Sequence, residues 1–411
     1  MTTTAIDLDT IQLADPAFWK RPDRQEVFAA FRRERPVAWQ SYPGRDGGFW
    51  SFTRHAETRE ISRDPGRFVS RFGSGMSSEN PEEAYVTGGM LNRDPPEHPR
   101  LRRIVARVFT PRLLRDVEDD MAASARAVVG AVSEQGACDF ATQVANRMPM
   151  KVICDMLGVP EADRDGLQAL TLQALGYGDE SVGGFDEAMT AFLALNAYGE
   201  GLARERRKRP GEDLVTTMVA AEVDGERLGD ADIGIYFQLL ITAGIETTAS
   251  SIAHGIAQLA RHPGQWAAWR ADFDGLAATA MEEIVRHGSP VVHFGRRAAV
   301  DTQVGGQAIA AGEQVVFWYG SANRDEAVFA DPDRFDITRS PNDHVGYGGG
   351  GPHHCLGMHM ARREMYHFFK ELFATLPDLE IDLDSMVPIN GMFINGMRSL
   401  PCRFTPVRKP S

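Results

Sequence analysis

A single cysteine follows a run of glycines at the expected start of a helix. Residues 344–363 read HVGYGGGGPHHCLGMHMARR, in which Cys355 comes directly after two histidines. Glycine has no side chain, so it lets the backbone approach a flat, bulky group closely. The free N–H groups and the positive dipole end at a helix N-terminus favour a thiolate. A helix from about Cys355 would therefore present a thiolate that can serve as an axial ligand for haem iron.

The same segment could belong to three other kinds of site. A phosphate-binding loop requires GxxxxGK[ST], and no Lys-Ser/Thr pair follows these glycines. A zinc site made of His353, His354, Cys355 and His359 would lack the usual spacers between its ligands. A cysteine buried in a turn, with no chemical role, remains open on this segment alone.

A carboxylate and two hydroxyl groups lie inside a long proline-free segment. Residues 243–248 read AGIETT and fall within 230–259, for which we expect one helix of roughly 45 Å with Asp230 as its N-cap. A threonine inside a helix can bond a carbonyl one turn back and bend the helix. We expect a local widening there that could hold O₂ and water. The alternative is an ordinary packed helix that carries a solvated glutamate.

Two further segments carry charged side chains one helical turn apart. Glu283 and Arg286 lie at i,i+3, and further along the chain residues 329–335 read FADPDRF. His98 and Arg102 lie at i,i+4 in the segment DPPEHPRLR. Side chains at these spacings share one face of a helix. Such pairs are most often weak and solvated when they stand alone.

A mainly helical fold with a smaller β-rich part is expected to position these groups. Residues 36–53 combine β-branched and aromatic residues with a glycine-rich turn, which predicts a hairpin. Most segments from about residue 97 to 285 show the periodicity of helices, and short β-like segments return after Pro290. We expect one domain, with β-rich parts at about 36–55, 290–320 and 380–405 and helical parts at about 56–289 and 355–376.

Composition and charge exclude several classes of protein. The 411 residues are 43% hydrophobic and 25% charged, as in ordinary globular proteins and unlike disordered or fibrous chains. The net charge of −13 argues against nucleic acid or an anionic membrane as the main partner. The first twenty residues do not read as a signal peptide, and no apolar run is long enough for a membrane anchor. Four scattered cysteines fit a reducing compartment, so we expect a cytoplasmic protein.

These segments, taken in their order along the chain, resemble the cytochrome P450 family. The family's haem-ligand signature, FxxGxHxCxG, is matched at four fixed positions by Gly351, His353, Cys355 and Gly357. Gly348 stands where the family usually has an aromatic residue, and Tyr347 lies one position earlier. The resemblance extends from about residue 15 to 404. It implies the cytochrome P450 fold, a single triangular-prism domain with a long central helix.

The resemblance also implies a role for each group. Cys355 would ligate the iron of haem b (iron protoporphyrin IX), Thr247 would hydrogen-bond the bound O₂, and Glu246 would supply protons. The haem propionates would be held by His98, Arg102, His353 and Arg296, with Arg297 as the alternative to the last. A buried structural charge network would consist of Glu283, Arg286 and Arg334. The remaining haem-contacting positions would be Ala243, Gly244, Tyr347, Gly348 and Gly357.

The activity implied by the resemblance is that of a haem-thiolate monooxygenase, which uses O₂ and electrons to insert one oxygen atom into a C–H bond. No GxGxxG follows a strand, so a ferredoxin with its reductase is the expected electron source. We expect a monomer whose basic face docks this acidic partner and is formed by Arg103, Arg107, Arg112, Arg362 and Arg363. The alternatives are a hydrogen-peroxide-dependent peroxygenase and a non-catalytic haem-binding protein.

The expected substrate is an apolar small molecule of the sterol, terpenoid or fatty-acyl type. The resemblance places its pocket along the long helix, just after Pro290 and near residues 392–397. The expected lining is mostly apolar, with a few polar groups that could orient one hydroxyl or carbonyl. The predicted lining residues are Gln238, Leu239, Val291, Val292, His293, Phe294, Asn395 and Met397.

Overall fold

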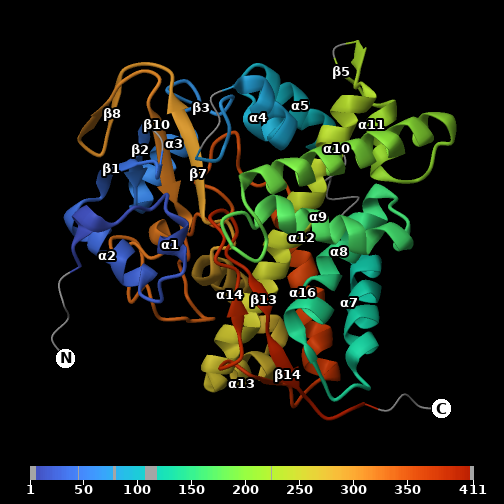
Figure 1. Cartoon of the computed structure of the whole chain (residues 1–411). Coiled ribbons are helices and arrows are strands. Elements are labelled where there is room, and N and C mark those ends of the chain that lie inside the picture. The colour runs from blue at the N-terminus through green and yellow to red at the C-terminus, as the bar shows by residue number, and fades with distance from the viewer. Residues whose placement is uncertain (1–5, 45, 77–79, 107–117, 224, 408–411) are drawn as a thin grey trace.

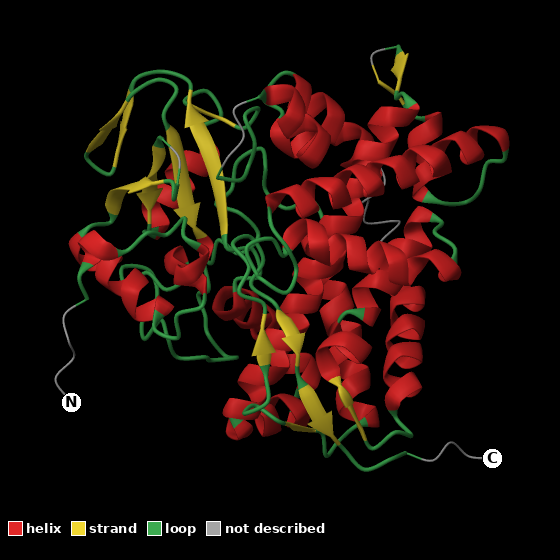
Figure 2. Ribbon diagram, viewed as in Figure 1, coloured by secondary structure: helices red, strands yellow, loops and turns green. Residues whose placement is uncertain are grey.

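Strands and helices occupy different parts of the structure, with the largest sheet on one side and most helices on the other (Figure 2). The computed structural model describes residues 6–44, 46–76, 80–106, 118–223 and 225–407. These residues form one mainly helical domain with a smaller strand part, which confirms the predicted fold class.

The helices are labelled in chain order in Figure 1. The α-helices are α1 (Pro16–Trp19), α2 (Arg24–Glu34), α3 (His55–Arg63), α4 (Pro81–Gly88), α5 (Glu97–Ala106), α7 (Glu118–Val132), α8 (Arg147–Leu157), α9 (Arg164–Leu175), α10 (Phe185–Lys208), α11 (Leu214–Ala220), α12 (Asp230–Arg261), α13 (Pro263–Ala271), α14 (Phe273–Gly288), α15 (Tyr319–Ala322) and α16 (Met358–Thr375). The shorter helical turns are η1 (Leu8–Thr10), η2 (Gly89–Asn92), η3 (Ala141–Ala145) and η4 (Glu161–Asp163).

The largest sheet has five strands in the spatial order β1 (Val37–Ser41), β2 (Gly48–Phe52), β10 (Gln314–Trp318), β7 (His293–Ala298) and β3 (Phe68–Val69). Strands β1 and β2 form the antiparallel hairpin that the sequence predicts. The smaller strands are β4 (Ala137–Asp139), β5 (Glu222–Val223), β6 (Glu226–Arg227), β8 (Thr302–Val304), β9 (Gln307–Ile309), β11 (Glu380–Ile381), β12 (Val387–Pro388), β13 (Met397–Ser399) and β14 (Pro401–Arg403). Strands β3 to β6 therefore interrupt the region at 56–289 for which helices are expected.

Strand β7 brings two side chains to one face of this sheet. It pairs with β10 in antiparallel register, with Phe294 opposite Phe317 and Arg296 opposite Val315. Side chains alternate between the two faces of a strand. Phe294 and Arg296 therefore share one face, and Arg297 lies on the other.

The long helix α12 passes through the middle of the helical part, beside α10 and α8 (Figure 1). Its 32 residues confirm the expected rod. The N-cap residue is Gly229, so the prediction that Asp230 is the N-cap is wrong by one position. Asp230 is the first helical residue, and its carboxylate accepts a hydrogen bond from Arg207. An acidic side chain in the first turn also complements the helix dipole.

Helix α16 begins after the glycine-rich segment. The sequence suggests that this helix starts at about Cys355. Its N-cap is Gly357, so Cys355 lies just before the helix and not in its first turn. A large apolar core surrounds α16 and includes parts of α7, α12 and α14. Among the helices described, none is long and apolar enough to cross a bilayer.

Candidate active site

A cavity lies between α12, the segment before α16, and the residues that lead into β7. Its empty volume is about 1390 Å³ including the open mouth, which leaves room for a large cofactor together with a second molecule. The predicted cofactor and O₂ residues that line it are Cys355, His98, Arg102, His353, Ala243, Gly244, Thr247, Tyr347, Gly348 and Gly357.

The Cys355 side chain opens into this cavity. Its backbone N–H donates to the carbonyl of Tyr347 at 3.0 Å, which closes the loop before α16. The N–H groups of Gly357 and Met358 donate to its sulfur and favour the thiolate. Burial outweighs these contacts and raises the pKa of the Cys355 thiol. A bound metal cation would reverse this balance, because a coordinating thiol loses its proton.

The glycine run approaches a neighbouring helix and only partly borders the cavity. Gly348, Gly350 and Gly351 have positive φ angles of 101°, 91° and 78°. A Cβ at Gly351 would lie 2.3 Å from the carbonyl oxygen of Ser62, and one at Gly349 would lie 2.6 Å from the Ser62 hydroxyl. The sequence suggests that these glycines let the backbone approach a flat cofactor. Gly349 and Gly351 instead lack side chains because the backbone packs closely against α3.

His98 and His353 stack at one edge of the cavity, with ring centroids 4.0 Å apart. His98 comes from α5, and His353 from the loop before α16. Burial, reinforced by Arg102 and Arg296, lowers the pKa of His98 to about 4. The same causes lower the pKa of His353 further still. Both rings are therefore neutral at neutral pH, and among the described residues neither Nδ1 atom has a hydrogen-bond partner.

Arg102 and Arg296 bring two positive charges beside these rings. Arg102 donates to the carbonyl of His354 at 2.6 Å, and Arg296 to the carbonyl of Gly295 at 2.7 Å. Within the ranges described, neither guanidinium pairs with a carboxylate. Arg296 is buried behind the cavity wall and its charge acts on both histidines.

Arg297 points away from this cluster. Its guanidinium lies over the ring of Phe72, 4.6 Å from the centroid. The strand register therefore favours Arg296 over Arg297 as a ligand for an anion in the cavity.

This set of groups fits a haem. Buried cations and orphaned imidazole nitrogens are costly in the protein alone and call for an anionic, hydrogen-bonding ligand. A thiol that opens into the same cavity calls for a metal cation. An iron porphyrin with two carboxylates would satisfy both ends of the site.

The middle of α12 forms one wall of the cavity. Thr247 lines this wall, and its hydroxyl donates to the carbonyl of Ala243 at 2.7 Å, the one-turn-back bond that the sequence suggests. Ala243 and Gly244 line the cavity beside it. Small side chains at these two positions leave the helix surface open to a flat ligand.

Glu246 is not the solvated glutamate of the alternative interpretation. Its side chain is only 3% exposed, and it does not line the cavity. Burial raises the pKa of this carboxyl to about 7. Among the described residues its Oε1 atom has no hydrogen-bond partner. A carboxyl with this pKa can hold and release a proton near neutral pH.

A second buried carboxyl, Glu364, was not predicted. It lines the cavity from α16, where burial raises its pKa well above the usual range. Met360, Glu364 and Phe368 are spaced i,i+4 on the buried face of this helix. A glutamate inside an apolar stripe is the signal that could have identified it.

Three of the eight residues predicted for the substrate pocket line this cavity. Leu239, Val291 and Phe294 line the cavity. Other apolar lining residues are Met90, Leu91, Ile153, Leu240, Pro290, Leu356 and Met360.

The other five predicted pocket residues do not line the cavity. Gln238 is turned away on α12 and donates to the hydroxyl of Thr242 at 3.2 Å. His293 lies on the opposite face of β7 from Phe294 and bonds the carbonyl of Met392 at 3.0 Å. Asn395 donates to the carbonyl of Gly288 at 2.6 Å. The remaining two are packed in apolar cores, Val292 and Met397. Helix rotation and strand alternation, which sequence proximity does not show, decide these cases.

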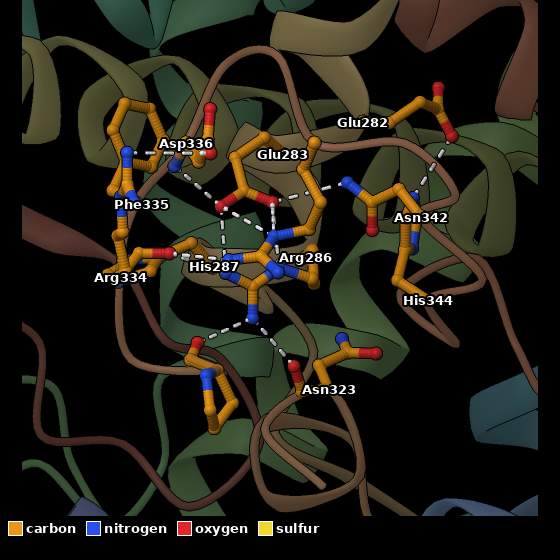
Figure 3. Close-up of polar contacts among 12 residues, drawn as sticks. Glu282, Glu283, Arg286, His287, Asn323, Arg334, Phe335, Asp336, Asn342 and His344 are labelled. Carbon is orange, nitrogen blue, oxygen red and sulfur yellow. Dashed lines mark hydrogen bonds and ion pairs between the residues drawn. The ribbon is translucent and has the colours of Figure 1, made fainter. Parts of the chain in front are cut away.

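Glu283 and Arg286 form a fully buried ion pair on α14 (Figure 3). Arg286 Nε and Nη2 donate to the two carboxylate oxygens at 2.7 and 2.8 Å. Nη1 donates to the carbonyls of Asn323 and Pro332 at 2.8 and 2.7 Å. The pair therefore fastens two loop segments to α14.

Arg334 does not join this network through its side chain, which corrects the prediction. Its carbonyl accepts a hydrogen bond from Arg286 at 3.1 Å (Figure 3). Its side chain is 65% exposed. Arg339 takes the predicted position, with Nε 3.2 Å from a Glu283 oxygen and a side chain only 10% exposed. The backbone turns between these two arginines, so spacing alone did not distinguish them.

The predicted basic face is partly neutralised. Arg362 forms a double hydrogen bond with Glu282, at 2.6 and 2.9 Å, and stacks on Tyr347. Arg363 pairs with Glu118 at 3.1 Å. Arg103 is exposed on α5. Arg107 and Arg112 lie outside the described residues.

Known proteins resemble this chain over nearly its whole length. Residues 196–390 match the family model described as "Cytochrome P450". A methyl-branched lipid omega-hydroxylase of Mycobacterium tuberculosis is 40% identical, over 96% of this chain and 95% of the relative. A steroid C26-monooxygenase of Mycolicibacterium smegmatis is 36% identical, over 94% and 92%. The structure of Mycobacterium marinum cytochrome P450 CYP268A2 in complex with pseudoionone matches with a TM-score of 0.91 and 39% identity, over 98% of this chain and 100% of that chain.

Proposed function

The chain belongs to the cytochrome P450 family and is a P450 monooxygenase with a haem-iron cofactor, and we propose that it hydroxylates an apolar lipid near the end of its carbon chain. The relatives named above are a hydroxylase of methyl-branched lipids and a steroid monooxygenase. The observation that carries the proposal is that Leu239, Val291 and Phe294 face the cavity into which Cys355 opens. An apolar wall favours a substrate that buries hydrocarbon.

We assign haem b to the site, held without covalent attachment, since the sequence contains no C-x-x-C-H motif. When bound, haem supplies the activation of O₂ for insertion into a C–H bond. The Cys355 thiolate would hold the iron and donate electron density to it. The propionates would be held by His98, Arg102, Arg296 and His353. The porphyrin ring would be bordered by Ala243, Gly244, Tyr347, Gly348 and Gly357.

The proton path is assigned to Thr247 and Glu246. Thr247 lines the cavity, and Glu246 lies one residue before it with a pKa of about 7. The Thr247 hydroxyl would orient O₂ by a hydrogen bond, and Glu246 would replace the protons consumed. A peroxide-driven enzyme would not need this pair, which favours O₂ as the oxidant.

Electrons are proposed to come from a ferredoxin and its reductase, because the sequence contains no nicotinamide-binding GxGxxG after a strand. We further propose that the enzyme works as a monomer in the cytoplasm, since its four scattered cysteines form no disulfide framework.

Substrate binding tests the proposal. Holoenzyme should show a shift of its main haem absorption band with methyl-branched fatty acids or sterols, because an apolar ligand displaces the water near the iron. Hydroxylated product should then form with ferredoxin, reductase and O₂. If no lipid of these classes shifts the band while a polar aromatic compound does, the substrate class is wrong.

Two adjacent valines provide a matched pair of variants. Val291→Ala enlarges the cavity and should weaken lipid binding by about tenfold and change which carbon is oxidised. Val292 is 7% exposed and packs in a separate apolar core, so Val292→Ala should leave the binding constant unchanged. Equal effects of the two substitutions on binding would contradict the assigned pocket.

A further inference from the structure

Two of the four cysteines face each other across a small sheet. Cys138 of β4 and Cys402 of β14 are register partners in an antiparallel pair. Their sulfur atoms are 3.4 Å apart, although 264 residues separate them in sequence. Directly opposed residues in such a pair have Cα atoms ~4.5–5.5 Å apart, which falls within the range that a disulfide spans. The strand register therefore permits a disulfide between the two residues.

The two thiols differ in access and acidity. Cys402 is 5% exposed and lies in the apolar core around α16, whereas Cys138 is partly exposed. The two sulfurs lie within hydrogen-bonding distance, and this contact lowers the pKa of Cys138 and raises the pKa of Cys402. The thiolate is the reactive form of a cysteine. Cys138 is therefore the thiol that an oxidant meets first.

We propose that Cys138 and Cys402 are an oxidisable pair that hydrogen peroxide converts to a disulfide. The Cys138 thiolate attacks one oxygen of the peroxide, the O–O bond breaks, and Cys138 becomes a sulfenic acid with release of hydroxide. The Cys402 thiol then attacks the Cys138 sulfur, the S–O bond breaks, and water leaves with the thiol proton. The net change is two thiols and one peroxide to one disulfide and two waters. A thiol reductant reverses it.

The bond would fasten the C-terminal strands to the helical part. Asp139 already accepts from the backbone N–H of Leu400 at 3.1 Å, and the N–H of Phe140 donates to the Leu400 carbonyl at 2.8 Å. The segment after Phe140 forms η3, which packs against α12. Neither cysteine lines the large cavity. Oxidation should therefore raise thermal stability without changing substrate binding.

The other two cysteines provide internal controls. Cys154 is fully buried on α8, and burial raises its pKa to about 12, so it should resist oxidation. In the holoenzyme the Cys355 sulfur would be bound to the haem iron. The inference does not depend on the proposed lipid substrate.

The test treats purified holoenzyme with a few equivalents of hydrogen peroxide, alkylates the remaining thiols in denaturant, and maps peptides by mass spectrometry. We expect a peptide pair joined through Cys138 and Cys402, which a thiol reductant removes. The oxidised protein should melt several degrees higher than the reduced protein, because the crosslink constrains the unfolded chain. Cys154→Ser should behave like the unaltered enzyme in both respects.

Cys402→Ser should leave Cys138 as a sulfenic acid that a dimedone-type reagent traps, with no rise in melting temperature. Cys138→Ser should abolish both the crosslink and the trapped product. Should either variant fail to fold, peptide mapping of the unaltered enzyme still decides the matter. Full alkylation of both cysteines after peroxide treatment, or oxidation of Cys154 before Cys138, would overturn the proposal.

Discussion

Thr247 and Thr242 make the same local hydrogen bond on α12 but face different surroundings. The Thr247 hydroxyl donates to Ala243 at 2.7 Å, and the Thr242 hydroxyl donates to Gln238 at 2.8 Å. Thr247 lines the cavity, whereas Thr242 is buried away from it. The two residues therefore separate the chemical role of a hydroxyl group from its effect on the helix.

Thr247→Ala should reduce the ratio of product formed to electrons consumed by about 10²-fold, within the usual range for loss of a positioned proton donor. Electron consumption should continue, with peroxide released in place of product. Thr242→Ala should keep the ratio near that of the unaltered enzyme. The measurement compares nicotinamide consumed, product and peroxide in the reconstituted system; equal loss of coupling in both variants would point to helix distortion instead.

Glu246 makes stability depend on pH. Its carboxyl has a usual pKa of 4.5, which burial raises to about 7 in the folded protein. The folded state binds this proton more tightly than the unfolded state. The contribution of Glu246 to the free energy of unfolding is therefore full below about pH 4.5, and it falls by roughly 3 kcal/mol as the pH rises to about 7. Glu246→Gln should therefore lose less stability than the unaltered protein between about pH 5 and 8. Urea unfolding at pH 5 and pH 8 measures the difference, and parallel losses in the two proteins would contradict the raised pKa of Glu246.

At the scale of elements, the ion pair on α14 connects the helix to the loop that follows α15. Glu283 forms ion pairs with Arg286 of its own helix and with Arg339 of the loop. The backbone N–H of Asp336 also donates a hydrogen bond to Glu283 at 2.8 Å. Removing one partner of a buried charge leaves the other uncompensated. The network should therefore be sensitive to Arg339 and insensitive to Arg334.

Arg339→Gln should lower the free energy of unfolding by on the order of 2–4 kcal/mol, because it leaves Glu283 short of positive charge. Arg334→Gln should change it by less than about 0.5 kcal/mol, since that side chain is exposed and only its carbonyl takes part. Thermal unfolding of the two variants makes the comparison. A larger loss for Arg334→Gln would restore the arrangement expected from the sequence.

The sequence predicts the elements well and the direction of individual side chains less well. The period of α12 and the hairpin of β1 and β2 follow from residue pattern, because local patterning decides them. Whether Arg296 or Arg297 lies on the cavity side of the sheet depends on the register of β7 with β10, and register is a long-range property. The same reason explains why Val291 lines the cavity while Val292 does not.

For the whole molecule, the net charge is −13, and part of the predicted basic face is paired with carboxylates. Glu282 and Glu118 already pair with Arg362 and Arg363, so these two arginines are less available to an acidic partner than their number suggests. Arg103 remains exposed on α5. Of the predicted basic face within the described residues, Arg103 is therefore the position for a charge test.

Arg103→Glu should slow electron transfer from an acidic ferredoxin by roughly threefold to tenfold at low salt, because charge complementarity steers association. The difference should shrink at high salt, where exposed charges are screened. Arg33→Glu on α2 makes the same charge change on an exposed helix of the strand-rich side and should have little effect. Stopped-flow reduction at several ionic strengths tests this; equal slowing by both variants would contradict a specific docking face.

Contacts between distant parts of the chain could not be predicted. Cys138 and Cys402 lie far apart in sequence, so nothing local indicates that their sulfurs meet. Residue 351 must be a glycine because the Ser62 carbonyl on α3 leaves no room for a side chain, and the local motif does not reveal this contact. The cavity itself was predicted through the order of several motifs, each of which is weak alone.

The account depends most on the Cys355 sulfur as the ligand of the haem iron. The direct measurement is the absorption spectrum of the reduced holoenzyme under carbon monoxide, for the unaltered chain and for Cys355→His. The unaltered chain should give the strongly red-shifted band of a thiolate-ligated iron, and Cys355→His should give the band of nitrogen ligation. A nitrogen-type band in the unaltered protein, or identical spectra for the two proteins, would contradict the account.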